Sequence, residues 1–400
     1  MKQRMTRILS VFALATVVAF INGCGGSGEI DLVGGMWIAP NHPAYQWDAV
    51  PPAKVPWDKI THLALGYVLL KEGSNGYTVT QDGVNGGYAQ FKVETKEFTD
   101  AARTHSRLTF MMIGGENSNP DDIWNKATAP ANIKKFAANI VTEMKSMGLD
   151  GIEIDWEENI DWDKIGKLAT EVRAIWPDGI ITIDTFPFGD EAEALAGYAD
   201  AVDMFMPMTF LNVAQWGGWI LPAPTSPIYE PDNNGYCYDR LLKKWTDAGV
   251  SPKKLLFGVG GYGGAWGDDN GDGKGPIAPY ANRANPNTRP AGETAAIFGD
   301  NYVTQAWVDK VVADHNLIEG WDDIGKSSYW HVPSETDFFV AERWGTKKNV
   351  TLVFYETDRS MKEKLDYVKA KGMSGFNFWT LSQLENAAGA YPLLNAIAPK

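Results

Sequence analysis

Cysteine and histidine are scarce in this sequence. Its 400 residues include two cysteines, Cys24 and Cys237, and five histidines. So few cysteines exclude the disulfide framework of many small secreted domains, and a chain with 44% apolar residues can bury a large core without one. No cluster of His and Cys has the spacing of a zinc site, and no glycine-rich loop has the spacing of a nucleotide site. The sequence therefore calls for no cofactor.

Positive charge is also in short supply. The chain has 36 Lys and Arg residues against 50 Asp and Glu residues, which gives a net charge of -14. A chain this acidic repels polyanions, and this excludes nucleic acid as a partner. Aromatic residues are plentiful, with 16 Trp and 15 Tyr. Their flat rings suit the apolar faces of sugars, but large cores use them too, so composition leaves both interpretations open.

One acidic stretch, residues 268–273, resembles the first half of an EF-hand calcium loop. The twelfth position of such a loop normally supplies a glutamate, whereas this chain has Pro279 there. A plain polar turn is therefore favoured, and no metal site is predicted.

A short apolar segment lies close to the N-terminus. Residues 8–21 are uncharged and mainly apolar, and they are fewer than the roughly 20 residues that cross a bilayer as a helix. Basic residues precede this segment, and Gly23 and Cys24 follow it. The pattern resembles a bacterial lipoprotein signal, in which cleavage leaves Cys24 as the acylated first residue.

This resemblance implies a signal peptide over residues 1–23 and a flexible tether over residues 24–32. The protein is then expected to be exported and held at the cell envelope or cell surface by a lipid on Cys24. Its contact with a membrane would be through this anchor alone. A signal for export of a soluble protein, with Cys24 present by chance, is the alternative.

From about residue 30 onward, short apolar runs alternate with segments of helical period. Eight runs read as strands: residues 34–38, 62–69, 108–113, 151–156, 180–186, 203–209, 255–260 and 374–380. Helical period is clearest in residues 133–147, 162–175 and 361–371. Strict alternation predicts an α/β fold with a parallel sheet, and a TIM (β/α)8 barrel closes eight strands without leaving edges. A doubly wound open sheet is the alternative.

One interval interrupts the alternation. More than a hundred residues separate the seventh predicted strand from the eighth, which is too long for a βα loop. Residues 266–350 are therefore predicted to form an inserted α+β lobe over the C-terminal face of the barrel.

The chemistry is concentrated in residues 149–158, which read Leu-Asp-Gly-Ile-Glu-Ile-Asp-Trp-Glu-Glu. Side chains alternate along a strand, so Glu153, Asp155 and Glu157 share one face and the hydrophobic residues share the other. In a barrel these acids point inward and rise toward the mouth, where barrel enzymes keep their active sites. Acids at a strand end can also be solvated or hold a helix N-terminus. Three inward carboxyls are costly to bury, however, and at least one pKa should be raised, as a general acid needs.

This segment resembles the D-G-x-D-x-D-x-E signature of glycoside hydrolase family 18, the chitinases and endo-β-N-acetylglucosaminidases. Asp150, Gly151, Asp155 and Glu157 match it, while Glu153 replaces the usual aspartate. The resemblance extends over about residues 33–397. It includes Gly114 and Gly115 in a strand similar to S-x-G-G, residues 254–266, and the final strand with Trp379. It assigns residues 33–400 to a family 18 barrel.

The resemblance implies retaining hydrolysis in which the N-acetyl oxygen of the substrate is the nucleophile. Glu157 would be the proton donor, Asp155 would orient the acetamido group, and Glu153 would hold or share the proton of Asp155. The substrate-binding candidates are Trp379, Tyr262, Met208, Phe210, Asn212, Trp216, Trp219 and Trp266. For Tyr262, Trp266, Trp216 and Trp219 a core role is an equal alternative.

The sixth predicted strand departs from the family pattern. The family reads M-x-Y-D where this chain has Met208, Thr209, Phe210 and Leu211, so the tyrosine hydroxyl and the aspartate are both missing. Asn212 is a candidate substitute for the lost donor.

The function expected from this resemblance is hydrolysis of chitin or chitooligosaccharides by an exported monomer. Two alternatives stay open: an endo-β-N-acetylglucosaminidase that cleaves the chitobiose core of N-glycans, and a catalytically weak, lectin-like glycan-binding barrel.

Overall fold

The computed structural model describes residues 31–38, 50–210, 222–231, 237–267, 273–281, 302–343 and 345–398. The predicted signal peptide, its lipidation site Cys24 and residues 24–30 of the predicted tether lie outside these ranges. The same holds for Asn212, Trp216 and Trp219, and for residues 268–272 of the calcium-like stretch.

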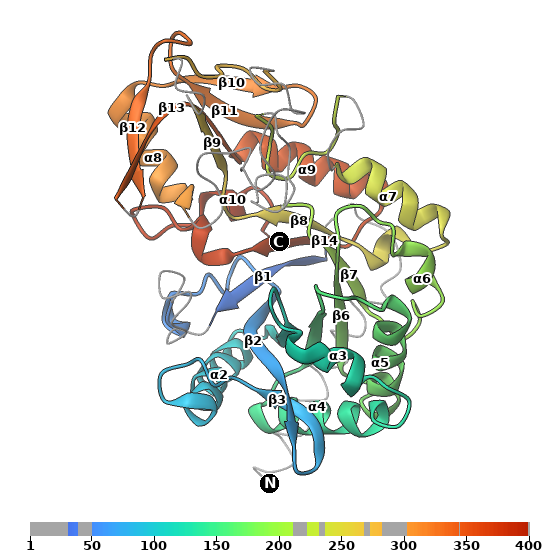
Figure 1. Ribbon diagram of the computed structural model, residues 1–400. Coiled ribbons are helices and arrows are strands. Elements are labelled where there is room, and N and C mark those ends of the chain that lie inside the picture. The colour runs from blue at the N-terminus through green and yellow to red at the C-terminus, as the bar shows by residue number, and fades with distance from the viewer. Residues whose placement is uncertain are drawn as a thin grey trace.

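Eight parallel strands form a nearly closed barrel, which Figure 1 shows with helices packed around it. In chain order they are β1 (Leu32–Ile38), β2 (His62–Gly73), β4 (Leu108–Gly114), β5 (Gly151–Asp155), β6 (Ile180–Thr185), β7 (Met204–Pro207), β8 (Leu256–Gly260) and β14 (Gly375–Trp379). Neighbours in the barrel follow the order β7-β6-β5-β4-β2-β1-β14-β8, and a bridge between Phe205 and Leu255 joins β7 to β8. The predicted TIM barrel is confirmed, with each of its eight predicted strands in place.

The helices alternate with these strands. They are α2 (Gly87–Thr104), α3 (Ile123–Ala127), α4 (Ile133–Met147), α5 (Trp162–Ile175), α6 (Ala192–Ala196), α7 (Tyr238–Asp247), α9 (Asp358–Lys371) and α10 (Pro392–Asn395). The bounds of α4 and α5 are those predicted. Helix α9 begins three residues earlier than predicted because Thr357 and Ser360 form a capping box, in which each side chain accepts a hydrogen bond from the other's backbone N–H.

Two separate apolar layers stabilise the barrel. Outward-facing strand residues such as Ile152 and Ile154 pack with the helices in the main core. The inward-facing residues at the lower end of the barrel form a cluster of their own: Leu32, Phe110, Ile180, Met204, Met206 and Leu256. This cluster fills the barrel interior, so chemistry is possible only above it, toward the C-terminal ends of the strands.

Strand β2 is longer than predicted. It continues to Gly73 and pairs with the antiparallel strand β3 (Gly76–Thr80), so that Leu69 lies opposite Thr80 and Gly73 opposite Gly76. Leu70 and Val79 are buried by this hairpin. The polar end of β2 is exposed and carries no strand periodicity, so the extension could not be predicted from the sequence.

A second, antiparallel sheet lies between β8 and β14 in the chain and stands at the top of the view in Figure 1. Its strands are β9 (Gly264–Gly267), β10 (Ile318–Asp322), β11 (Ser327–His331), β12 (Phe339–Arg343) and β13 (Thr346–Tyr355), and α8 (Gln305–His315) accompanies them. The sheet draws on residues 264–355. A separate lobe with the limits 266–350 stays a prediction.

The end of β13 is tied to the barrel. The single O–H of Tyr355 is shared between the carbonyl oxygen of Gly261, just after β8, at 3.0 Å, and that of Gln383, beyond β14, at 3.2 Å. Tyr355 is buried, so these bonds are shielded from water.

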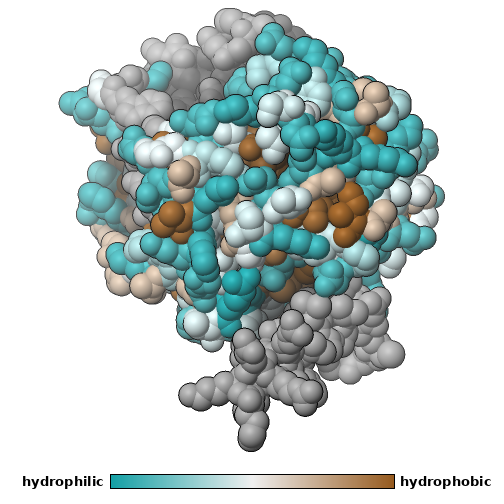
Figure 2. All heavy atoms as spheres, turned by 90° about the horizontal axis from the view of Figure 1, so that it is seen from below, coloured by the Kyte–Doolittle hydropathy of each residue, from teal (hydrophilic) through white to brown (hydrophobic). Residues whose placement is uncertain are grey.

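One face of the molecule is mainly polar. Figure 2 shows this face as largely hydrophilic, with apolar side chains in small separate patches. Among the described residues, none of the helices has both the length and the apolar character needed to cross a bilayer.

Candidate active site

The three predicted catalytic acids lie on one face of β5 and its extension, as the alternation of side chains along a strand predicts. Glu153 and Asp155 lie inside the barrel and are 2% and 4% exposed, and Glu157 follows two residues beyond the strand end and is half-buried. The residues between them, Ile154 and Trp156, belong to the outer core. The structure therefore brings the carboxyls together at the open end of the barrel.

The first two residues of the motif have structural roles. The carboxylate of Asp150 accepts hydrogen bonds from the backbone N–H and the hydroxyl of Thr109, at 2.9 and 3.3 Å. At Gly151, a Cβ atom would lie 2.2 Å from the carbonyl oxygen of Ile180 on the neighbouring strand. Asp150 thus joins β5 to β4, and only glycine lets β6 approach this closely.

Two glycines on the other side make room for Asp155. Gly114 and Gly115 have φ angles of 120° and 96°, in the region that favours glycine. A Cβ atom on Gly114 would lie 1.8 Å from the carbonyl oxygen of Asp155, and the N–H of Gly115 donates to that oxygen at 2.7 Å. These glycines allow β4 and the loop after it to close over the end of β5.

A fourth carboxyl, Asp184 on β6, was not among the predicted site residues. It is 8% exposed and hydrogen-bonds to Glu153. Within β6 the inward positions Thr182 and Asp184 alternate with Ile181 and Ile183, which lie in the outer core. This alternation of polar and apolar residues was the available signal, but a lone aspartate in an apolar strand matches no catalytic motif.

Burial and mutual repulsion raise the pKa of all four carboxyls. Burial, together with the charge of Asp155, raises the pKa of Glu153 to about 8, although its hydrogen bond with Asp184 opposes this. Burial and the nearby Glu158 and Glu116 raise the pKa of Glu157 to about 7. Burial and the neighbouring acids also hold the pKa of Asp155 and of Asp184 well above the usual range. The predicted rise in pKa is therefore found in every member of the cluster.

The carboxyl of Glu157 is held on two sides. It hydrogen-bonds to Asp155 and accepts a hydrogen bond from the backbone N–H of Glu116. The following loop is fixed by the carbonyl oxygen of Glu158, which accepts bonds from the Trp156 indole at 2.6 Å and from Asn119 at 2.8 Å. The position of Glu157 is therefore set before any ligand enters.

Aromatic residues form a cluster near these acids. It contains five of the predicted substrate-binding residues: Met208, Phe210, Tyr262, Trp266 and Trp379. The rings of Phe210 and Trp379 are stacked, with centroids 6.4 Å apart, and the hydroxyl of Tyr262 donates to the carbonyl oxygen of Phe210 at 2.9 Å. Tyr262 and Trp266 are almost fully buried, whereas Trp379 is partly exposed and offers ring surface to a ligand.

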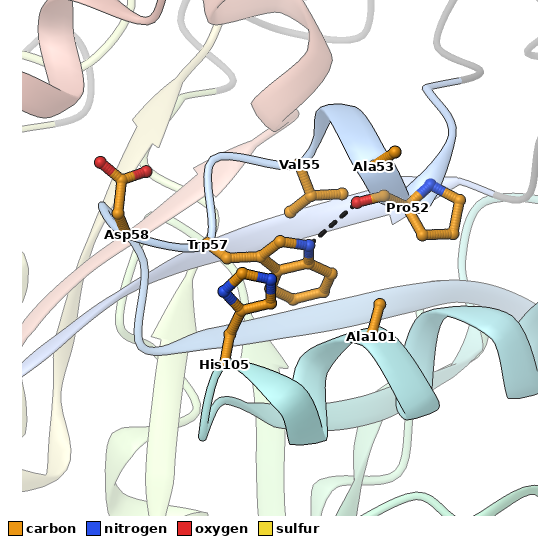
Figure 3. Close-up of a pocket in the computed structure, with 7 residues that line it drawn as sticks. All are labelled: Pro52, Ala53, Val55, Trp57, Asp58, Ala101 and His105. Atoms are coloured by element: carbon orange, nitrogen blue, oxygen red, sulfur yellow. Dashed lines mark hydrogen bonds between the residues drawn. The ribbon is translucent and has the colours of Figure 1, made fainter.

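Two other observations limit the site. Among the described residues, no group of three or more His, Cys, Asp or Glu side chains is arranged to hold a metal ion. A cavity of about 460 Å³ lies beside the entry to β2, at the opposite end of that strand from the barrel mouth (Figure 3). There Trp57 stacks on His105, with centroids 5.8 Å apart, and its indole N–H donates to the carbonyl oxygen of Pro52. The indole N–H of Trp57 is therefore already paired. With Asp58 as the one carboxyl among its lining residues, this cavity lacks the cluster of acids found at the barrel mouth.

Comparison with known proteins identifies the family. The model of the family described as "Glycosyl hydrolases family 18" matches residues 43–383. An endochitinase of Manduca sexta is 22% identical over 353 residues, covering 82% of this chain and 59% of the relative. A probable endochitinase of Caenorhabditis elegans is 25% identical over 319 residues, covering 72% of this chain and 47% of the relative. The chain thus spans about half the length of these two curated relatives.

Solved structures agree on the fold. A class V chitinase from Nicotiana tobaccum in complex with NAG4 superposes with a TM-score of 0.68 at 17% identity, covering 92% of this chain and 97% of that one. The family match, which spans the acids of β5 and reaches beyond Trp379, confirms the resemblance stated from the sequence. The chain belongs to glycosyl hydrolases family 18.

Proposed function

We propose that the protein hydrolyses β-1,4-linked N-acetylglucosamine in chitin or chitooligosaccharides, with Glu157 as the proton donor. One observation carries this proposal: Glu157 stands at the mouth of the barrel with a pKa raised to about 7 and a hydrogen bond to Asp155. A glutamate with an ordinary pKa would be ionised at neutral pH and could not donate a proton. With a pKa near 7, Glu157 is still protonated in a large share of the molecules at neutral pH and can act as a general acid.

The reaction is proposed to retain the configuration at the anomeric carbon. Glu157 gives its proton to the glycosidic oxygen as the bond from that oxygen to the anomeric carbon breaks. The carbonyl oxygen of the substrate's own N-acetyl group attacks the same carbon and forms an oxazolinium ion. Water then opens this ring, with the Glu157 carboxylate taking a proton from it. Asp155 accepts a hydrogen bond from the acetamido N–H and stabilises the positive charge of the oxazolinium ion.

The aromatic cluster is proposed to bind the sugar. Trp379 presents a partly exposed ring within reach of the acids, and Phe210 stacks against it. Rings of this kind match the apolar face of a pyranose. The names of the two relatives, an endochitinase and a probable endochitinase, and the NAG4 complex of the Nicotiana enzyme support chitooligosaccharides as the substrate class.

The absence of a hydroxyl on Phe210 bears on the two alternative functions. An enzyme that lacks the tyrosine of the M-x-Y-D pattern has one donor fewer for the N-acetyl oxygen, and losing such a donor typically costs about 100-fold or more in rate. A catalytically weak, lectin-like barrel would fit this loss, whereas an endo-β-N-acetylglucosaminidase acting on N-glycan cores would use the same N-acetyl oxygen and is not favoured by it. Retention of both Asp155 and Glu157 favours the enzyme.

The test compares the parent protein with Glu157→Gln on a fluorogenic chitobioside and on a native N-glycoprotein. Turnover by the parent and a loss of 100-fold to 10,000-fold in kcat for the variant support the proposal. Glu97→Gln, the same substitution at an exposed site on α2, should leave turnover unchanged. Proton NMR of the first product should show the β-anomer. Tight oligosaccharide binding without turnover of either substrate would identify a lectin.

We also propose that the protein is exported and anchored by a lipid on Cys24. The basic residues, apolar run and Gly23-Cys24 pair at the start of the chain support this. Metabolic labelling with a tritiated fatty acid should mark the parent but not Cys24→Ser. Label on neither protein, with both recovered in the medium, would indicate export of a soluble protein.

A further inference from the structure

Asp184 stands beside the catalytic acids at a height set by the pairing of β5 and β6. Glu153 pairs with Thr182 and Ile154 with Ile183, so the residues that follow, Asp155 and Asp184, lie at the same height in the barrel. Neighbouring strands are about 4.8 Å apart. Asp184 therefore reaches Glu153 below it and faces Asp155 beside it.

The four carboxyls form two hydrogen-bonded pairs. Asp184 bonds to Glu153, and Asp155 bonds to Glu157. A hydrogen bond between two carboxyls needs a proton on one of them, because an ionised carboxylate can only accept. Each pair therefore holds at least one proton, and the resting cluster holds at least two.

The surroundings supply no compensating cation among the described residues. Apart from the cluster itself, the titratable groups that approach it are Glu116 after β4, Glu158 after β5 and the phenol of Tyr67 on β2. The inward residues of the other adjoining strands are neutral: Met112 on β4, Met206 on β7, and Asn377 and Trp379 on β14. No described salt bridge involves any of the four carboxyls. A buried cluster of this kind must keep protons to remain stable.

We propose that Asp184 is a positioning residue that, together with Glu153, keeps a second proton in the carboxyl cluster beside the one held by Asp155 and Glu157. The effect of Asp184 on catalysis rests on the proposed hydrolysis. With this proton in place, the lower pair carries one negative charge instead of two. Asp155 and Glu157 then meet less repulsion, and Glu157 remains acidic enough to release its proton to the leaving oxygen.

Two substitutions of Asp184 should affect the protons of the cluster differently. Asp184→Asn replaces the shared O–H by an amide N–H, so Glu153 keeps a donor and the pair carries one negative charge whenever Glu153 is ionised. Asp184→Val leaves Glu153 buried without a partner, so Glu153 takes up a proton itself and the pair becomes neutral. A merely structural role for Asp184 would lower stability in both variants without distinguishing them.

The first measurement needs no activity. Carbon-13 NMR of the labelled carboxyl groups of Asp and Glu, followed from pH 5 to pH 10, counts the protons that the folded protein releases. The parent should release one more proton from the cluster than Asp184→Asn. Asp366→Asn, at an exposed position on α9, should leave the proton release of the cluster unchanged. Release of equal numbers of protons by the two proteins, with Asp184 already ionised at pH 5, would overturn the proposal.

The second measurement is the pH profile of kcat/KM. The parent should decline over two ionisations on the alkaline side and Asp184→Asn over one, with similar values below pH 6. Asp184→Val should shift the decline to lower pH by about one unit, because a negative charge has left the cluster. Identical profiles for all three proteins would overturn the positioning role. If the parent turns over no glycan while the NMR titration shows the shared proton, the proposed function fails and the second proton stands.

Discussion

Phe210 and Trp379 lie face to face, with their ring centroids 6.4 Å apart and their planes 14° apart. Phe210 follows β7, and Trp379 ends β14, so the stack joins two strands that are not neighbours in the barrel. Trp379 also packs with Tyr67 and Met112 on the opposite side of the barrel mouth. The ring of Phe210 thus reaches the place where the acids, the aromatic cluster and the substrate would meet.

Phe210→Tyr should increase activity. The new hydroxyl would restore the donor that the M-x-Y-D pattern supplies, and such donors are worth about 100-fold in kcat when they are aligned with the developing charge. We expect a rise of about 10-fold in kcat with little change in KM, measured on a chitobioside. Phe186→Tyr, in the same cluster, is the matched control and should give no gain. A fall in kcat for Phe210→Tyr would show that the hydroxyl cannot be accommodated.

The activity should fall as the pH rises through about 7. Glu157 must be protonated to act as the donor, and its pKa of about 7 means that it is protonated below this pH and ionised above it. The value of kcat/KM should therefore be highest below about pH 7 and decline above it. Glu116→Gln removes one of the neighbouring charges that raise this pKa, so its profile should move to lower pH. Activity that stays constant up to pH 9 would contradict the assignment of Glu157.

The stability should also decrease with rising pH because of Glu153. Its pKa is about 8 in the folded protein against the ordinary 4.5, so folding favours the protonated form. This contribution of Glu153 to the free energy of unfolding is fully present below about pH 4.5. It is lost as the pH rises to about 8, at up to about 1.4 kcal/mol per pH unit. Calorimetric Tm values of the parent should fall between pH 5 and pH 8.5. Glu153→Gln, which cannot ionise, should show a smaller fall; an equal fall would contradict the pKa.

A buried ion pair outside the site should control stability without affecting chemistry. The Lys364 ammonium on α9 donates to the Glu356 carboxylate at 2.8 Å, and the two side chains are 0% and 3% exposed. Lys364→Met leaves Glu356 buried and unpaired, which should cost about 3–5 kcal/mol of unfolding free energy in urea titrations. The double variant Lys364→Met with Glu356→Leu should recover most of this.

The control for that pair is Lys243, which bonds to Asp247 on the surface of α7. Lys243→Met should cost less than about 0.5 kcal/mol, because exposed helix pairs contribute little. Equal losses at the two sites would mean that burial does not determine the cost.

The barrel could be predicted because its strands and helices have local signatures. The runs of apolar residues located the eight strands to within a few residues, and the three- and four-residue spacing in α4 and α5 located those helices at their ends. Alternation along one strand also sufficed to bring Glu153, Asp155 and Glu157 to the mouth, because the three residues share a single β-strand and its extension.

Features that depend on pairing between distant segments could not be predicted from the sequence. Asp184 lies 31 residues after Glu153 and meets it only through the register of β5 and β6. The antiparallel sheet is similar: β13 pairs with β9, β11 and β12, and none of these partners is set by a local pattern. Sequence periodicity assigns a face to each residue, but it does not say which residue on another strand lies opposite.

The Tyr355 hydroxyl has a consequence for the rigidity of the barrel mouth. It joins the end of β13 to the segments that follow β8 and β14. Because these three segments meet at one buried atom, we expect them to move as a unit, so that this part of the barrel mouth keeps its shape before and after a ligand binds.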